Sequence, residues 1–166
     1  LILYVPKFDY IQARIFSFFN REVGTHNFQS DKAIESITSG GFFGKGIGEG
    51  VLKNRVPEAH TDYIISVISE EFGVVAIILI LLLFLMFIYM VFKKINYEKD
   101  DKTKLVLIGC VSLILMQATI HVGVNIRLFP TTGMTLPFLS YGGSSIVSIS
   151  ILSGVILNLT KRKIEN

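Results

Sequence analysis

The stretch FGVVAIILILLLFLMFIYMVF, from Phe72 to Phe92, decides the fold of this chain because its 21 residues carry no charge. A helix needs about 20 mostly apolar residues to cross the hydrocarbon core of a bilayer. The whole chain has a matching composition, since 51% of its 166 residues are hydrophobic, only 17% are charged, and the mean hydropathy is +0.57. The composition therefore argues against a soluble domain and predicts a membrane protein.

Two further charge-free stretches are long enough to cross a membrane. The first, Leu105–Ile126, is interrupted by the polar residues Gln117, His121 and Asn125. The second, Leu128–Thr160, contains two prolines that confine a regular helix to about its last 20 residues. We therefore predict an all-α polytopic membrane protein with three transmembrane helices and a large extracytoplasmic loop.

The positive charges predict how the spans are oriented. Five lysines crowd the linker at 93–104, and three basic residues follow the third span at 161–163, whereas the loop at 127–140 carries only Arg127. Because an excess of Lys and Arg marks cytoplasmic segments, the linker and the C-terminus should be cytoplasmic. The net charge of +3 thus reports topology and gives no reason to expect nucleic-acid binding.

The spans divide the chain into eight expected segments. They are the end of a preceding span (1–5), an extracytoplasmic loop with short amphipathic helices (6–62), a span (63–92), a cytoplasmic linker (93–104), a span (105–126), an extracytoplasmic loop (127–140), a span (141–160) and a cytoplasmic tail (161–166). Since the chain starts inside an apolar run without an initiator Met, we expect the C-terminal part of a larger helical bundle. The single cysteine, Cys110, predicts neither a disulfide framework nor a metal cluster.

The glycine-rich stretch GGFFGKGIGEG, from Gly40 to Gly50, invites comparison with phosphate-binding loops. It lacks the spacing and the Ser or Thr of a P-loop, and no strand precedes it as a dinucleotide-binding pattern requires. Two interpretations stay open. The stretch is either a tight irregular loop whose glycines adopt positive φ, or a backbone surface that approaches a ligand, with Lys45 near an anionic group.

Acidic and polar residues gather at the entrance to the first span. On a helix that begins at Asp62, the residues Ser66, Ser69, Glu70 and Gly73 fall on one face with it. Such a polar stripe, descending from the outer surface, should face a bundle interior or a watery cavity and not lipid. Acids retained in a span are candidates for function.

A plainer interpretation is open for the same region. Glu58, Glu70 and Glu71 would be solvated at the helix end, and His60 would be a solvated or hydrogen-bonded neighbour. Asp62 would interact favourably with the positive end of the helix dipole. No second His or Cys lies at metal-ligand spacing, so we expect no zinc site.

The connection before the last span is also unusual. NIRLFPTTGMTLPFLSYGGSS, from Asn125 to Ser145, contains two prolines, three glycines and several hydroxyl groups. Irregular backbone at membrane depth is tolerated only where it is buried in protein or lines a cavity. The small residues at 142–145 would also allow close helix packing, and packing alone is an equally good interpretation.

Three segments of this chain resemble those of one family of membrane proteins. PEAHTDYIISVISEEFG (Pro57–Gly73) and PTTGMTLPFLSYGGSS (Pro130–Ser145) resemble the two signature regions of the SEDS family, FtsW/RodA/SpoVE, of bacterial wall synthesis. QSDKAIESITSGGFFGKGIGEG (Gln29–Gly50) resembles the loop that precedes them. The resemblance covers nearly the whole chain from Gln29 onward, and it is closer to the division member than to the elongation member.

The resemblance implies a ten-span peptidoglycan glycosyltransferase that polymerises lipid II at the outer face of the bacterial cytoplasmic membrane. The implied partners are a class B penicillin-binding protein that supplies the transpeptidase and other proteins of the division septum. The family's essential aspartate falls on Asp62, which we expect to be the general base. Lys45, Arg55 and Arg127 are local candidates to bind the pyrophosphate, although Arg127 departs from the small or apolar residue expected there.

The expected substrate-binding residues come from the same motifs and from the polar stripe. They are Lys45, Glu58, His60, Ser66, Pro130, Gly133, Pro137, Ser140, Tyr141, Gly142 and Gly143. No protein-held metal is expected, and a divalent cation, Mg²⁺ or Mn²⁺, stays open as a cofactor. A lipid II flippase and a non-catalytic scaffold of the wall-synthesis complex are the alternative functions.

Overall fold

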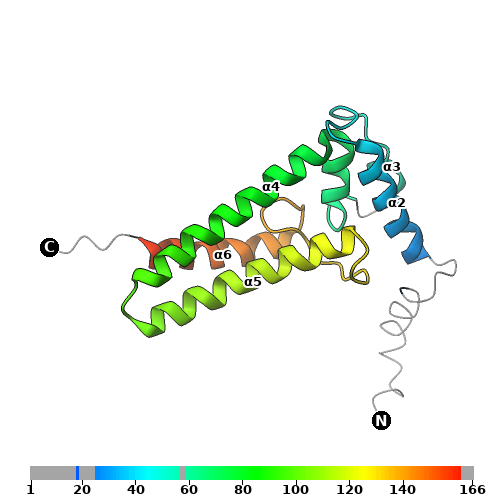
Figure 1. Cartoon of the computed structure of the whole chain (residues 1–166). Helices are drawn as coiled ribbons and strands as arrows, with labels where there is room; N and C mark the ends of the chain where they lie inside the picture. The colour runs from blue at the N-terminus through cyan, green and yellow to red at the C-terminus, as the bar shows by residue number, and fades with distance from the viewer. Residues whose placement is uncertain (1–17, 19–24, 57–58, 162–166) are drawn as a thin grey trace, which may run out of the picture.

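The computed structural model describes residues 18, 25–56 and 59–161, and the regular structure in these residues is helical (Figure 1). The helices are α2 (Thr25–Gly40), α3 (Leu52–Arg55), α4 (Ile64–Tyr97), α5 (Asp101–Asn125) and α6 (Gly143–Thr160). Three of them, α4, α5 and α6, are long and apolar enough to cross a membrane. The predicted fold class, all-α with three candidate spans, is confirmed.

The connection between α4 and α5 is shorter than the linker expected at 93–104. Helix α4 continues through Lys93 and Lys94 to Tyr97, and α5 already begins at Asp101. Asp100 caps α5, because its carboxylate accepts hydrogen bonds from the backbone N–H of Lys102 at 3.3 Å and of Thr103 at 3.1 Å. The lysines of this connection therefore belong to the helix ends as much as to a loop.

Helix α4 is broken at Gly73, where φ is 79° and ψ is −179°. Only glycine adopts this conformation without strain. We call the part before the break, Ile64–Phe72, the head, and the part after it, Val74–Tyr97, the arm. Figure 1 shows them as two separate limbs, with the head beside α2 and α3 and the arm running away from them. The span expected at 63–92 thus belongs to a helix with a break at Gly73, which the sequence did not predict.

The glycine-rich stretch fills the break. The N–H groups of Lys45 and Gly46 donate to the carbonyls of Glu70 (2.9 Å) and Glu71 (3.1 Å) at the end of the head. At the start of the arm, the N–H of Val74 donates to the carbonyl of Gly41 at 3.0 Å. Helix ends leave backbone groups without intrahelical partners, and this loop supplies those partners to both ends.

Close backbone approach explains the glycines on both sides of this contact. A Cβ at Gly40 would lie 2.0 Å from the carbonyl oxygen of Ser69, and one at Gly73 would lie 2.2 Å from that of Phe42. Gly44 and Gly46 have φ of 78° and 117°. The interpretation of a tight, irregular loop with positive φ is confirmed.

Three apolar clusters hold the elements together, and the smallest joins Ile65, Ala118 and Leu136. In the first, Ala33 of α2 and Leu52 of α3 pack against Tyr63 and Val67 at the head and Val124 at the end of α5. The second joins the three spans and consists of Val91, Ile95, Leu107, Val111, Ile114, Ile149 and Ile156. The head is thus fixed to the end of α5, which places the residues before it against the connection between α5 and α6.

Candidate functional site

The two signature segments, far apart in the sequence, lie side by side. The N–H of Tyr141 donates to the carbonyl of His60 at 3.2 Å. The hydroxyl of Ser140 donates to the carbonyl of Thr61 at 2.8 Å and accepts a hydrogen bond from the N–H of Leu136, also at 2.8 Å. These bonds fix the turn before the head to the connection at 126–142.

Asp62 stands at this junction, one residue before the N-cap of the head, and is half-buried. A Cβ built on Gly133 would lie 3.7 Å from its Oδ2 atom, which is van der Waals contact. The carboxylate therefore approaches the backbone of the second signature at Gly133, where φ is 70°. The positive φ favours glycine at that point.

Asn125, at the end of α5, holds Asp62 in place. It is fully buried, and its side-chain amide donates to the carbonyls of Asp62 (3.0 Å) and His121 (2.9 Å). Its Oδ1 atom accepts from the N–H of Ser66 at 3.2 Å and from the hydroxyl of Ser66 at 2.7 Å. Tyr63, the N-cap residue of the head, makes no side-chain cap hydrogen bond. Asn125 therefore caps the head from another helix.

Gln117 and His121 extend this polar row along α5. The side-chain amide of Gln117 donates to the carbonyl of Thr135 at 2.9 Å and to the hydroxyl of Ser145 at 3.0 Å. His121 is fully buried, and its Nδ1 atom lies 2.7 Å from the carbonyl of Met134. That bond requires a proton on Nδ1, whereas Nε2 has no hydrogen-bond partner among the described residues.

Gln117, His121 and Asn125 were not expected to have a role, although their spacing contains a signal. Gln117, His121 and Asn125 are four residues apart, so they share one face of α5. A polar row at that spacing in a span predicts a polar partner inside the protein. The partners are the connection at 126–142 for Gln117 and His121, and the turn and first helical turn at Asp62 and Ser66 for Asn125.

Glu70 lies in a different environment from the solvated one expected. Its side chain is buried and accepts hydrogen bonds from the N–H groups of Val51 (3.1 Å) and Leu52 (3.0 Å). It also forms an ion pair with Lys45, whose Nζ lies 2.9 Å from Oε1. The prediction of a solvated Glu70 is wrong, because the loop before α3 folds over this carboxylate and satisfies it.

Because Lys45 pairs with Glu70, its side chain lies away from Asp62. Glu70 follows Asp62 by eight residues along the head, which corresponds to about 12 Å at the rise of an α-helix. The structure therefore does not bring Lys45 to Asp62. Arg127 is also engaged elsewhere, in an ion pair with Asp31 of α2. Arg55 lines a small polar cavity beside Glu70 and Lys45.

The remaining predicted site residues differ in exposure. Ser66 and Pro137 are fully buried, and Ser140 is 5% exposed. The side chains of His60 and Tyr141 are exposed.

The other motif positions are small or partly buried. Pro130 is partly buried, and a Cβ at Gly142 would lie 2.9 Å from Cγ2 of Thr135, whereas one at Gly143 would meet open space. Glu58 lies outside the described residues. In the part of the chain that is described, no three His, Cys, Asp or Glu side chains are grouped to hold a metal ion.

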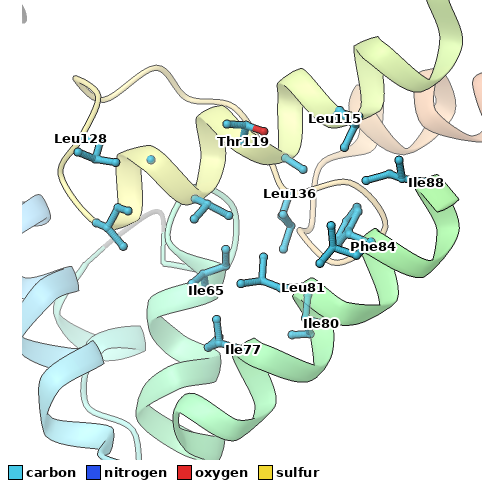
Figure 2. A pocket seen from close by; sticks show the side chains of 15 residues that line it. Ile65, Ile77, Ile80, Leu81, Phe84, Ile88, Leu115, Thr119, Leu128 and Leu136 are labelled. Carbon is cyan, nitrogen blue, oxygen red and sulfur yellow. The ribbon is translucent and has the colours of Figure 1, made fainter. Parts of the chain in front are cut away.

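An apolar cavity of about 360 Å³ adjoins the site (Figure 2). It lies between the arm and α5, and its lining includes Ile77, Leu81 and Phe84 of the arm. Ile65, three residues after Asp62, and Leu136, three residues after Gly133, also point into it. Each signature segment thus contributes both to the polar junction and to this hydrocarbon-lined space.

Comparison with protein families gives one match over almost the whole chain. A family model described as FTSW_RODA_SPOVE, cell cycle protein, matches residues 1–165.

Curated proteins give consistent matches. The chain is 38% identical over 161 residues to a "Probable peptidoglycan glycosyltransferase FtsW" of Caulobacter vibrioides, covering 94% of this chain and 40% of that relative. Proteins with the same description from Enterococcus hirae and Bacillus subtilis are 35% and 40% identical, covering 95% and 75% of this chain but 41% and 31% of the relatives. This chain thus spans less than half the length of these relatives.

One solved structure has a similar fold. It is described as "Structural coordination of polymerization and crosslinking by a peptidoglycan synthase complex". One of its chains superposes with a TM-score of 0.74 over 95% of this chain and 44% of that chain, at 23% identity. At that identity the match supports the fold.

Proposed function

Because this chain belongs to the FtsW/RodA/SpoVE family of cell cycle proteins, we propose that it carries the catalytic aspartate of a peptidoglycan glycosyltransferase. The whole enzyme would polymerise lipid II into glycan strands at the outer face of the cytoplasmic membrane during division. One observation supports the proposal above the others: the two signature segments are hydrogen-bonded to each other around the Asp62 carboxylate.

The proposed reaction needs one general base. The 4-hydroxyl of one sugar attacks the anomeric carbon of another, and Asp62 takes the hydroxyl proton as the new glycosidic bond forms. The bond between the anomeric carbon and the lipid pyrophosphate breaks, and its electron pair leaves with the pyrophosphate. Since that group departs without a proton, the second carboxylate that glycoside hydrolases use as an acid is not required.

The apolar cavity supports a lipid-linked substrate. Its lining is hydrocarbon from the arm, from α5 and from both signature segments, and it lies next to the polar junction at Asp62. A substrate with a sugar at one end and a polyprenyl chain at the other needs a site in which a polar part lies next to an apolar part. The charge of the pyrophosphate needs a counterion, and Lys45 and Arg127 are paired with Glu70 and Asp31. We propose that a divalent cation, Mg²⁺ or Mn²⁺, coordinated by oxygens of the substrate would supply that charge and leave Asp62 free to act as the base.

The proposed partners follow from the family and from the relatives. A class B penicillin-binding protein would cross-link the glycan strands, and other septal proteins would recruit the pair. The "peptidoglycan synthase complex" to which the similar solved structure belongs supports this assignment. The linker between α4 and α5 and the C-terminus would be cytoplasmic, and the junction at Asp62 would face outward.

The first test compares wild type with Asp62→Asn in the complete protein, purified with its penicillin-binding partner while the transpeptidase is blocked. We expect Asp62→Asn to bind lipid II but to form no polymer, and chelation of divalent cations to slow the wild type. The exposed acid Glu49 provides the matched control, since Glu49→Gln should polymerise normally. Polymer from Asp62→Asn at the wild-type rate would contradict the base assignment. If wild type moved lipid II across a bilayer without forming polymer, a flippase would be the better description.

A further inference from the structure

The polar row of α5 holds both sides of the contact between Asp62 and Gly133. On one side, the amide of Asn125 donates to the carbonyl of Asp62 at 3.0 Å. On the other side, Nδ1 of His121 donates to the carbonyl of Met134, the residue after Gly133, at 2.7 Å. His121 and Asn125 are four residues apart, or about 6 Å along the helix. One face of α5 therefore sets the spacing of the two signature segments.

The second signature has no regular secondary structure where it meets Asp62. Its residues 130–136 fold back along α5 (Figure 1). The carbonyls of the two residues after Gly133 accept hydrogen bonds from His121 at 2.7 Å and from Gln117 at 2.9 Å. Both carbonyls directly follow the positive φ at Gly133. Side chains of α5 therefore fix the backbone that approaches the carboxylate.

His121 is the more specific of the two donors. Gln117 also donates to the hydroxyl of Ser145 in α6 at 3.0 Å, so it contributes to helix packing as well. His121 bonds to the connection through Nδ1, and its Nε2 has no hydrogen-bond partner among the described residues. The residues of this chain alone bury the ring fully. Its contacts therefore do not depend on what covers the exposed faces of the spans.

We propose that His121 is a positioning residue for the reaction, because its bond to the carbonyl of Met134 holds the Gly133 backbone against the Asp62 carboxylate. This role rests on the proposed function of Asp62 as general base. A base must lie within hydrogen-bond reach of the proton that it takes. Since the ring is buried, His121 acts through the backbone of the second signature and not on the substrate.

Three substitutions at this position separate the Nδ1 bond from the rest of the ring. Asparagine places an amide nitrogen near the position of Nδ1, glutamine places one near Nε2, and leucine has no donor. In the complete protein with its penicillin-binding partner, His121→Asn should polymerise lipid II at nearly the wild-type rate. His121→Leu and His121→Gln should lose about a hundredfold in kcat with little change in KM, since a base displaced by about 1 Å still permits substrate binding.

Two further measurements distinguish positioning from a loss of stability. Leu107→Ala removes a fully buried side chain of α5 about 21 Å from His121, so it should lower the melting temperature and leave kcat unchanged. Hydrogen exchange followed by mass spectrometry reports on the connection without any activity. It should be faster at 130–142 in His121→Leu than in the wild type, and unchanged there in His121→Asn.

A wild-type kcat in His121→Leu would overturn the proposal, and His121→Gln decides in the same way if the leucine variant does not fold. An equal loss in His121→Asn would also overturn it, because the Nδ1 bond would then not be the cause. The same holds for a comparable kcat loss in Leu107→Ala. A wild type that forms no polymer would refute the proposed function instead. Exchange then tests the contact alone, and equal rates at 130–142 in His121→Leu and wild type would overturn it.

Discussion

Asp62 owes its position to a residue that comes 63 places later in the chain. Asn125 donates to the carbonyl of Asp62 and accepts from the N–H of Ser66, so one buried amide fixes both the turn and the first helical turn after it. Tyr63, the N-cap residue, makes no side-chain cap hydrogen bond. The position of the Asp62 backbone therefore depends on tertiary structure, because the end of α5 fixes it.

Asn125→Ala should lower the rate of the proposed reaction more than it weakens lipid II binding. The change removes the hydrogen bonds that Asn125 makes to the carbonyl of Asp62 and the N–H of Ser66 in a buried site, and a buried polar group that loses its partner costs about 1–3 kcal/mol. Displacement of the base by about 1 Å should lower kcat by about a hundredfold. Steady-state kinetics with the complete protein give kcat and KM separately, and thermal unfolding gives the stability.

The matched variant is Ser66→Ala, which removes only the hydroxyl bond at 2.7 Å and keeps the backbone cap. It should lower kcat much less than Asn125→Ala. Equal losses in the two variants, or an unchanged kcat in Asn125→Ala, would show that the amide does not position Asp62.

Among the elements, the head and arm of α4 depend on one glycine and on the loop bound to it. Backbone in the conformation of Gly73 is essentially restricted to glycine, and a Cβ there would also lie 2.2 Å from the carbonyl of Phe42. The break and the loop that fills it are therefore one unit, and neither forms as seen without the other.

Gly73→Ala should destabilise the protein by about 1–3 kcal/mol from backbone strain, with the clash against Phe42 in addition. Gly143→Ala is the control, because a Cβ there meets open space and the residue is helical. It should unfold at the wild-type temperature or slightly above. Thermal unfolding in detergent compares the two, and equal melting temperatures would contradict the account of the break.

Periodicity and composition predicted the spans but not the break. An apolar run such as Phe72–Phe92 can be identified from the local sequence alone, and a glycine at its edge is compatible with a continuous helix. Glu70 looked like a solvated acid for the same reason: its partners, Lys45 and the N–H groups of Val51 and Leu52, come from a loop whose path no local pattern predicts.

The sequence predicted that the two signature segments belong to one site, but not how they contact each other. The family resemblance placed Asp62 and Gly133 in one site without giving their geometry. The polar row Gln117, His121 and Asn125 has readable spacing, yet nothing in the sequence names its partners, which are the connection at 126–142 for the first two residues and Asp62 for the third. Residue roles that rest on buried hydrogen bonds to backbone carbonyls need the folded chain.

For the whole molecule, the orientation in the membrane is the prediction that every other one assumes. Lysines mark the connection between α4 and α5, whereas the connection between α5 and α6 has Arg127 as its only charge. In whole cells, a membrane-impermeant maleimide should label Thr132→Cys and leave Lys99→Cys unlabelled until the membrane is opened. Both positions are exposed, and Cys110 is first replaced by Ala. Labelling of Lys99→Cys in intact cells would reverse the topology.

Because of the break at Gly73, only part of α4 has to match the thickness of the bilayer. As one rod, its 34 residues would measure about 51 Å, far more than the hydrocarbon core of about 30 Å. The arm alone measures about 36 Å, which a modest tilt accommodates. The head stays fixed to α5 through Asn125, and the arm packs on α5 and α6 through the second apolar cluster. The head and the Asp62 junction are therefore left out of the length on which the hydrophobic mismatch with a thinner or thicker membrane acts.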